Sequence, residues 1–216
     1  MNFVTRLDVE IPIGDNFLRG VLERDDVSSE FCAIILHPNP RYGGDSNNYV
    51  VNRLVEICRK EGLISMKFDF RGTASNPIGY SSIKSSVEDA IAIRDYLRLE
   101  QGLTHFGILG YSYGGSVGLA VAISEPLQFL VTLSASADLL GSTGVSIAEV
   151  SKIKCPVLMF HGENDRVVPL KDMRTIATNL QNNKSAITLP GEGHFYQRSL
   201  EKVEKTIRPF IQSIET

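Results

Sequence analysis

The sequence predicts a doubly wound α/β fold, built on a mostly parallel eight-stranded sheet with an antiparallel edge at its N-terminal end. Short apolar runs alternate along the chain with longer stretches of helical periodicity, and Gly, Pro, Asn or Ser stands at the junctions. The first two runs alternate apolar with polar residues, whereas the later runs are continuously apolar. Alternation is typical of half-exposed strands, and continuous runs are typical of strands that helices cover on both faces.

The first two runs are expected to pair as an antiparallel edge hairpin, and the later runs to form the parallel part of the sheet. The expected strands cover residues 3–11, 17–24, 31–37, 64–70, 106–111, 129–135, 156–161 and 186–190. A helix is expected over 48–61, ending before Gly62. A second is expected over 85–99, opened by a capping box of Ser85 and Glu88.

The C-terminal helix is expected over 200–214, where the apolar side chains form one stripe. A small, apolar helix is expected directly after the 106–111 strand. The chain contains no repeat, linker or low-complexity tract, so a single domain over residues 1–216 is expected. The segment 137–154 leaves room for a short lid at most.

Composition favours a globular protein with a sizeable core. A chain of 216 residues buries roughly 70% of its unfolded surface on folding. The three cysteines, Cys32, Cys58 and Cys155, are odd in number and lie in apolar surroundings, which favours buried free thiols in a reducing compartment. Cytoplasmic localisation is therefore expected.

Charge and hydropathy exclude several classes of partner. The net charge is −3 and the basic residues are scattered, so a nucleic-acid partner is not expected. The N-terminus lacks a signal-peptide pattern, and no segment approaches the ~20 apolar residues that span a bilayer. No Cys/His cluster has metal-ligand spacing and no Gly-rich loop has the phosphate-cradling order, so neither a metal nor an organic cofactor is expected.

The segment Gly110-Tyr111-Ser112-Tyr113-Gly114 follows an apolar strand and precedes a small, apolar helix. At such a turn a serine is held at strained backbone angles, and the chain crosses itself so closely that the positions two before and two after it require glycine. Glycine-rich strand ends also occur for tight packing alone, or as an anion-binding helix start without chemistry, so the context must support the interpretation. Ser112 is the candidate nucleophile.

A serine hydroxyl needs a base to take its proton and a third group to orient that base. Asp165 follows the 156–161 strand, and His194 follows the 186–190 strand. Both therefore belong to the carboxyl edge of the sheet, where open α/β sheets place their sites. The chain order Ser112, Asp165, His194 predicts a catalytic triad, with Asp138 as the alternative acid.

Acyl transfer develops negative charge on the former carbonyl oxygen, which requires two fixed donors. One is expected to be the backbone N–H of Tyr113. The other is expected from the loop after the 31–37 strand, where Pro38 and Pro40 have no N–H but hold the N–H of Asn39 stiffly between them. The alternative is that the two prolines only terminate the strand.

With these residues identified, the chain resembles the α/β-hydrolase superfamily over nearly its whole length. GYSYGG at 110–115 resembles the nucleophile elbow, HGENDRVVP at 161–169 the acid loop, and GEGHF at 191–195 the histidine loop. FDFRG at 68–72 resembles the superfamily's D-x-R-G signature, although the run that follows departs from the usual glycine and serine.

Within that superfamily the chain is similar to small esterases of the dienelactone hydrolase branch, because HPNPRYGG at 37–44 resembles the oxyanion loop of that branch. Dienelactone hydrolases carry cysteine where this chain carries Ser112, so lactone specificity is not carried over. The resemblance implies a serine hydrolase with little or no cap. We expect a carboxylic ester hydrolase that acts through an acyl-enzyme on small or short-acyl esters.

Other readings of the same residues remain open. Thioesterase, amidase and acyltransferase chemistry use the same triad, and a non-catalytic member of the fold could bind a small molecule. The expected apolar walls of the site are Tyr42, Tyr113, Leu139, Leu140 and Phe195. Arg41 and Arg166 could engage an acidic substrate, but solvated surface charges are the favoured interpretation. His37 and His161 are expected to be structural, and His105 exposed.

Overall fold

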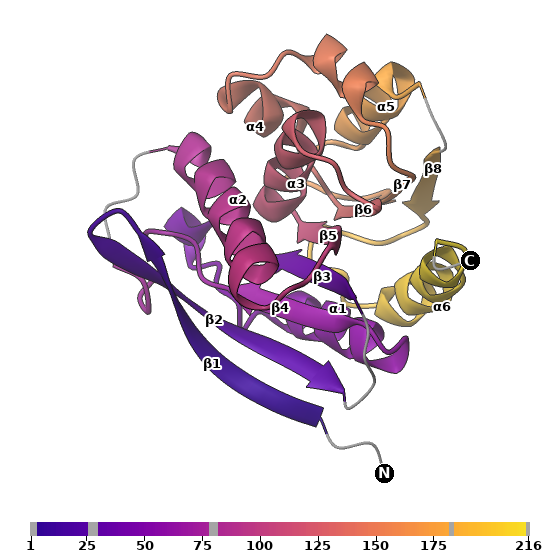
Figure 1. The fold of residues 1–216 in the computed structure, drawn as a ribbon. Helices are drawn as coiled ribbons and strands as arrows, with labels where there is room; N and C mark the ends of the chain where they lie inside the picture. The colour runs from indigo at the N-terminus through magenta and orange to yellow at the C-terminus, as the bar shows by residue number, and fades with distance from the viewer. Residues whose placement is uncertain (1–3, 26–29, 78–81, 182–183, 215–216) are drawn as a thin grey trace.

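A computed structural model describes residues 4–25, 30–77, 82–181 and 184–214 (Figure 1). Eight strands form one sheet in the order β1-β2-β4-β3-β5-β6-β7-β8. The β1–β2 and β2–β4 pairs are antiparallel and all others are parallel, which confirms the predicted fold class. The strands are β1 Val4–Ile13, β2 Asn16–Asp25, β3 Phe31–Leu36, β4 Ile64–Phe68, β5 His105–Tyr111, β6 Phe129–Leu133, β7 Val157–Gly162 and β8 Lys184–Leu189.

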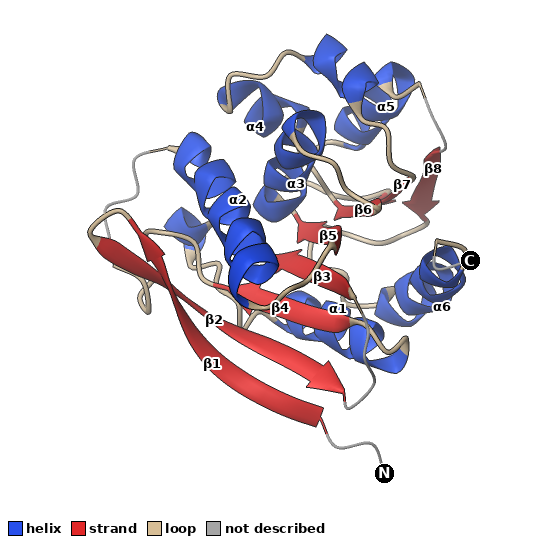
Figure 2. Ribbon diagram, in the orientation of Figure 1, coloured by secondary structure: helices blue, strands red, loops and turns tan. Residues whose placement is uncertain are grey.

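Helices cover both faces of the sheet (Figure 2). Two helices, α1 (Tyr49–Lys60) and α6 (Leu200–Gln212), pack on one face. The other face is covered by α2 (Ile83–Glu100), α3 (Tyr113–Ser124), α4 (Ala137–Ser142) and α5 (Leu170–Asn179). Two short 3₁₀ helices, η1 (Pro40–Tyr42) and η2 (Ile147–Lys152), complete the chain.

The central strands β4, β3, β5 and β6 are buried at nearly every position because they contribute to both layers. In β3, Ile34 and Leu36 pack under α2 and α3, whereas Ala33 and Ile35 pack under α1. Successive side chains of a strand point to opposite faces, so a strand between two helical layers has no position facing water. The predicted contrast between edge and central strands is therefore confirmed.

One detail at the start of α2 differs from the prediction. The helix begins at Ile83 with Ser82 as its N-cap, and the Ser85 hydroxyl donates back to the Ser82 carbonyl oxygen at 2.6 Å. Ser85 lies inside the first turn, so the expected Ser85/Glu88 capping box is wrong. Residues 78–81, just before the helix, lie outside the described part of the chain.

The register aligns the carboxyl ends of the parallel strands. Leu36 is opposite Gly110, and Leu133 pairs with both Tyr111 and Phe160. The loops after β3, β5, β6 and β7 therefore leave the sheet along one edge, and the loop after β8 joins them. This edge is where the sequence places every candidate site residue.

The three cysteines are free and buried, as expected. Burial raises the pKa of the Cys58 thiol to about 12 and that of Cys155 to about 11, which keeps both in the unreactive thiol form. Among the described residues, no helix is both long and apolar enough to cross a membrane.

Candidate active site

Ser112 occupies the turn between β5 and α3 in a conformation that non-glycine residues rarely adopt. Its φ is 54° and its ψ is −115°. The turn is so tight that a Cβ on Gly110 would lie 2.3 Å from the Gly114 carbonyl oxygen, and one on Gly114 would lie 2.3 Å from the Leu36 carbonyl oxygen. Both contacts are with backbone, so only glycine fits at either position.

Two hydrogen bonds connect Ser112, His194 and Asp165 in a line. His194 Nε2 lies 3.0 Å from Ser112 Oγ, and His194 Nδ1 lies 2.8 Å from Asp165 Oδ2. All three residues are buried. Because the ionised carboxylate only accepts, Nδ1 carries the proton in the neutral imidazole and Nε2 is left as an acceptor for the serine proton.

The Asp165 carboxylate has four donors. The Val167 and Val168 amides donate to Oδ1 at 2.9 and 2.8 Å, while His194 and the Ser134 hydroxyl (2.8 Å) donate to Oδ2. Burial favours the protonated acid, but these hydrogen bonds, that of His194 foremost, outweigh it and hold the pKa of Asp165 below its ordinary value. The acid therefore stays ionised beside the imidazole.

Asp138, the alternative acid, is not a hydrogen-bond partner of His194. Asp138 is exposed in the first turn of α4, and both ring nitrogens of His194 already have partners in Ser112 and Asp165. His105 is half-exposed and stacks on Phe31 with ring centroids 4.8 Å apart. The structure thus brings together Ser112, Asp165 and His194 and leaves Asp138 out.

The loop after β3 is rigid around Asn39. The Asn39 carbonyl oxygen accepts from Tyr42 N at 3.1 Å and from Gly44 N at 3.0 Å, and the Asn39 side chain accepts from Arg41 N at 2.9 Å. Within the described part of the chain, the Asn39 N–H has no hydrogen-bond acceptor. Tyr113 is the first residue of α3, where the helix dipole favours negative charge.

His37 ties this loop to the loop after β4. Its Nδ1 donates to the Pro38 carbonyl oxygen at 2.6 Å, and its Nε2 accepts from the Phe70 amide at 2.9 Å. His37 is therefore structural, as expected. In the run after the D-x-R-G segment, the Ser75 hydroxyl donates to the Asp69 carboxylate, and the Asn76 side-chain amide donates to the Asp69 carbonyl oxygen.

Two clefts meet at Ser112. The larger, of about 680 Å³, extends over α4 and the start of α2, and its walls include Ile83, Ser136 and Leu139. The smaller, of about 260 Å³, is lined by His194, Phe195, Tyr111 and the glycines after Tyr42. Asn39, Tyr42, Ser112 and Val167 border both.

Three of the five expected wall residues line these clefts: Tyr42, Leu139 and Phe195. The side chains of Tyr113 and Leu140 are fully buried in the core, so those two expectations are wrong. Arg41 is exposed and borders the larger cleft, and Arg166 is exposed.

Three close neighbours of the aligned residues, Ser134, Tyr196 and Tyr111, were given no role by sequence reasoning, and a fourth, His161, was expected to be structural. Ser134 contacts Asp165, Tyr196 contacts Ser134, and the Tyr111 hydroxyl donates to the His194 carbonyl oxygen at 3.0 Å. His161 Nε2 donates to the Val168 carbonyl oxygen at 2.9 Å and lies 3.5 Å from Asp165 Oδ2. The available signal was positional: Tyr111 ends β5, Ser134 directly follows β6, His161 is one residue before the end of β7, and Tyr196 follows His194 by two.

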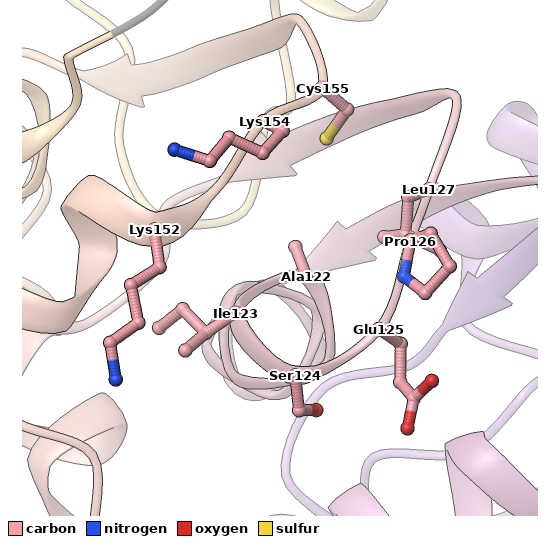
Figure 3. A pocket seen from close by; sticks show the side chains of 9 residues that line it. All are labelled: Ala122, Ile123, Ser124, Glu125, Pro126, Leu127, Lys152, Lys154 and Cys155. Carbon is pink, nitrogen blue, oxygen red and sulfur yellow. The ribbon is translucent and has the colours of Figure 1, made fainter.

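A further pocket of about 270 Å³ lies at the other end of α3 (Figure 3). Its walls come from the last residues of α3 and from the segment before β7, with Lys152, Lys154 and Glu125 around it. The twelve residues of α3 separate it from Ser112 by about 18 Å. Among the described residues, no group of three or more His, Cys, Asp or Glu is placed to hold a metal ion.

The chain is similar in sequence to several known proteins. The chain is 25% identical over 191 residues to an uncharacterized protein of Rickettsia prowazekii, covering 85% of this chain and 79% of the relative. It is 29% identical over 126 residues to a mouse carboxymethylenebutenolidase homolog, covering 56% of this chain and 49% of that one. The chain thus spans about half the length of the mouse relative.

Solved structures share the fold. An α/β serine hydrolase homologue from Coxiella burnetii superposes with a TM-score of 0.84 at 22% identity, covering 94% of this chain and 96% of that one. A dienelactone hydrolase from Anabaena variabilis gives a TM-score of 0.83 at 18% identity, covering 97% and 98%. The dienelactone hydrolase family profile matches residues 65–205, which include the elbow, the acid loop and the histidine loop. The chain is therefore a hydrolase of the α/β-hydrolase fold and belongs to the dienelactone hydrolase family.

Proposed function

We propose that this chain is a serine hydrolase that cleaves small carboxylic esters through an acyl-enzyme. The observation that carries the proposal is the pair of hydrogen bonds from Ser112 Oγ to His194 Nε2 and from His194 Nδ1 to Asp165 Oδ2. A serine at a strained turn, within 3.0 Å of an imidazole whose other nitrogen is held by an ionised acid, has the geometry of an activated nucleophile.

In the proposed mechanism Ser112 Oγ attacks the ester carbonyl carbon while His194 Nε2 takes the serine proton. The backbone amides of Asn39 and Tyr113 donate to the oxyanion, and Asp165 stabilises the imidazolium. His194 then gives its proton to the leaving alcohol, and the acyl group stays on Ser112. Water then attacks the acyl carbon while His194 takes its proton, the bond from the acyl carbon to Ser112 Oγ breaks, and His194 returns the proton to Ser112 Oγ as the carboxylic acid leaves.

The two clefts have different roles in this mechanism. The leaving oxygen must lie within hydrogen-bond reach of His194 Nε2 when it receives the proton. His194 lines only the smaller cleft, so the alcohol belongs there and the acyl group belongs in the larger one. An apolar cavity of about 150 Å³ holds a benzene ring, so the smaller cleft fits an alcohol of roughly one substituted ring.

Thioesters, amides and acyl transfer remain alternatives with the same residues. Tyr42, which borders the larger cleft, is 89% exposed, so we expect water to reach the acyl-enzyme and hydrolysis to be favoured. Residues 137–154, proposed as a short lid on one domain of residues 1–216, supply Leu139 and Ser142 to the wall of that cleft.

A fluorophosphonate probe tests the proposal directly. It is expected to label the wild-type protein once, at Ser112, and to stop hydrolysis of p-nitrophenyl acetate. Ser112→Ala should abolish labelling and leave a residual rate of roughly 10³ to 10⁴ above water. Ser124→Ala, at the opposite end of α3, is the matched control and should behave like the wild type. A wild type that is neither labelled nor active on any ester, thioester or amide would favour the non-catalytic binder.

The acid is tested by two further variants. Asp165→Asn should lower kcat by on the order of 10⁴, because the amide no longer selects the required imidazole tautomer. Asp138→Asn removes the charge of the exposed alternative and should leave kcat unchanged. The reverse pattern would assign the acid role to Asp138.

A further inference from the structure

Three non-glycine residues among those described have a positive φ, and all three lie at one place. They are Ser112 at 54°, Ser134 at 51° and Tyr196 at 51°. Side chains disfavour this conformation, and it persists only where the surrounding structure enforces it. The strain at Ser112 belongs to the nucleophile turn, but the other two residues have no role in the mechanism above.

Backbone hydrogen bonds bind Ser134 between its two neighbouring strand ends. The Ser112 amide donates to the Leu133 carbonyl oxygen at 2.7 Å, and the Ser134 amide donates to the Phe160 carbonyl oxygen at 2.9 Å. The ends of β5, β6 and β7 are thereby fixed to one another at the point where the serine turn and the acid loop leave the sheet. A left-handed residue at 134 continues this pairing and turns its side chain toward Asp165.

The Ser134 hydroxyl connects the acid to Tyr196. It donates to Asp165 Oδ2 at 2.8 Å and lies 3.0 Å from the Tyr196 hydroxyl, which also donates to the Phe160 carbonyl oxygen at 3.1 Å. Ser134 and Tyr196 are both fully buried. The single serine proton is directed to the carboxylate, so the serine oxygen accepts from Tyr196 whenever the phenol turns away from Phe160.

Four hydrogen bonds account for the acceptor capacity of the Asp165 carboxylate. An ionised carboxylate has about four acceptor positions, and Asp165 fills them with two backbone amides, Ser134 and His194. The ionisable groups facing it are His194 from the β8–α6 loop, His161 from β7, and the phenols of Tyr111 and Tyr196. Among the described residues, Ser134 supplies the side-chain hydroxyl that donates to Oδ2, the oxygen that also binds His194.

We propose that Ser134, held in place by Tyr196, is a positioning residue that fixes Asp165 Oδ2 in line with His194. The inference rests on the proposed serine hydrolase function. Neither residue lines a cleft at Ser112, so both act through the acid and not on the substrate.

The test compares Ser134→Ala with Ser134→Gly. Both remove the hydroxyl, but glycine adopts a positive φ without strain and so preserves folding if alanine does not. Both variants should lower kcat by about 10- to 100-fold, as loss of a hydrogen bond to a charged group does, with KM nearly unchanged. The acid limb of the kcat/KM profile should move to higher pH, because a carboxylate with one donor fewer stabilises the imidazolium more strongly.

Two further variants serve as comparisons for the Ser134 variants. Tyr196→Phe should lower kcat by less than either Ser134 variant, and its effect should vanish in the Ser134→Ala background, since it acts through that serine. Ser86→Ala removes an equally buried hydroxyl, bonded at 2.7 Å to the Tyr113 hydroxyl away from the acid, and should leave the acid limb in place.

A readout without turnover separates the inference from the proposed function. The His194 Nδ1 proton, bonded to Asp165, should give a low-field proton resonance that is lost in His194→Gln and shifted in both Ser134 variants. An unshifted resonance in folded Ser134→Gly would overturn the inference even in an active enzyme. A shifted resonance in a protein that no fluorophosphonate labels would uphold the contact while refuting the serine hydrolase.

Discussion

The turn around Ser112 depends on two neighbouring glycines, which have no side chain. Gly110 and Gly114 face each other across the turn, and Gly114 also faces the end of β3, where Leu36 and His37 present carbonyl oxygens. Backbone oxygens cannot rotate away as a flexible side chain can. The position of the nucleophile and the position of the Asn39 loop are therefore set by the same contact.

We predict that Gly114→Ala damages activity more than stability. The added Cβ would lie 2.3 Å from the Leu36 carbonyl oxygen, so the turn or the end of β3 must move. Overpacking of this kind costs about 1–3 kcal/mol of folding free energy. A shift of about 1 Å at a reacting group costs on the order of 100-fold in rate. Thermal unfolding and the rate of fluorophosphonate labelling measure the two effects.

Gly141→Ala is the matched control for this substitution. Gly141 lies within α4, and a Cβ there would meet none of the described atoms within 4 Å apart from those of its chain neighbours and its own helix backbone. Alanine in a helix is favoured over glycine by roughly 0.5–1 kcal/mol, so this variant should be as active as the wild type and no less stable. Equal loss of labelling in both variants would contradict the role assigned to the turn.

At the scale of elements, the strands were predictable because the pattern of apolar and polar residues along a strand reflects which of its faces are buried. The expected 31–37, 106–111 and 129–135 strands match β3, β5 and β6 to within two residues at each end. The α4 and α5 helices were not predicted, because short helices on a crowded edge carry too few periodic positions. Ser134 was missed for another reason: its left-handed backbone is imposed by neighbouring strand ends, which no local pattern records.

The placement of Ser112, Asp165 and His194 was predictable for a simple reason. Each follows a buried strand, and parallel strands end at one edge. The residues that line the clefts were less predictable, because the sequence does not show whether a side chain points into a cleft or into the core. Tyr113 shows this, because its side chain enters the core and bonds Ser86, while its amide remains at the start of α3.

The assignment of the acyl group and the alcohol to different clefts leads to a prediction for one residue of each cleft. Leu139, on α4, lines the larger cleft, and Phe195, beside the proposed base, lines the smaller one. Leu139→Ala should change KM within a series of p-nitrophenyl esters of increasing acyl length. Phe195→Ala should change KM within a series of acetates of increasing alcohol size. Each variant serves as the control for the other series, and exchanged effects would reverse the assignment of acyl and alcohol sides.

At the scale of the whole molecule, His37 couples the active-site edge to global stability. It is fully buried, and it joins the Asn39 loop to the loop after β4 through Pro38 and Phe70. Burial is the main reason that its pKa falls from 6.5 to about 4. The bond from the Phe70 amide needs a neutral Nε2, so protonation of His37 removes a link between two loops of the site.

The sign of the resulting pH dependence follows from linkage. The unfolded chain protonates His37 near pH 6.5, whereas the folded chain does so only near pH 4. The stabilising contribution is therefore complete above about pH 6.5 and is lost as the pH falls toward 4, by on the order of 3 kcal/mol. Asp89 opposes this change, because burial raises its pKa to about 6 and its folded form gains stability as it protonates.

Comparison with His37→Asn isolates the contribution of His37, since Asp89 and the other groups are common to both proteins. The variant should be less stable at pH 7.5, where it lacks the two hydrogen bonds of the buried imidazole. Urea unfolding from pH 7.5 to 4.5 should show the gap in unfolding free energy closing as the pH falls. A gap that stays constant over this range would mean that His37 titrates alike in the folded and unfolded chains, and that its burial does not set the acid limit of the fold.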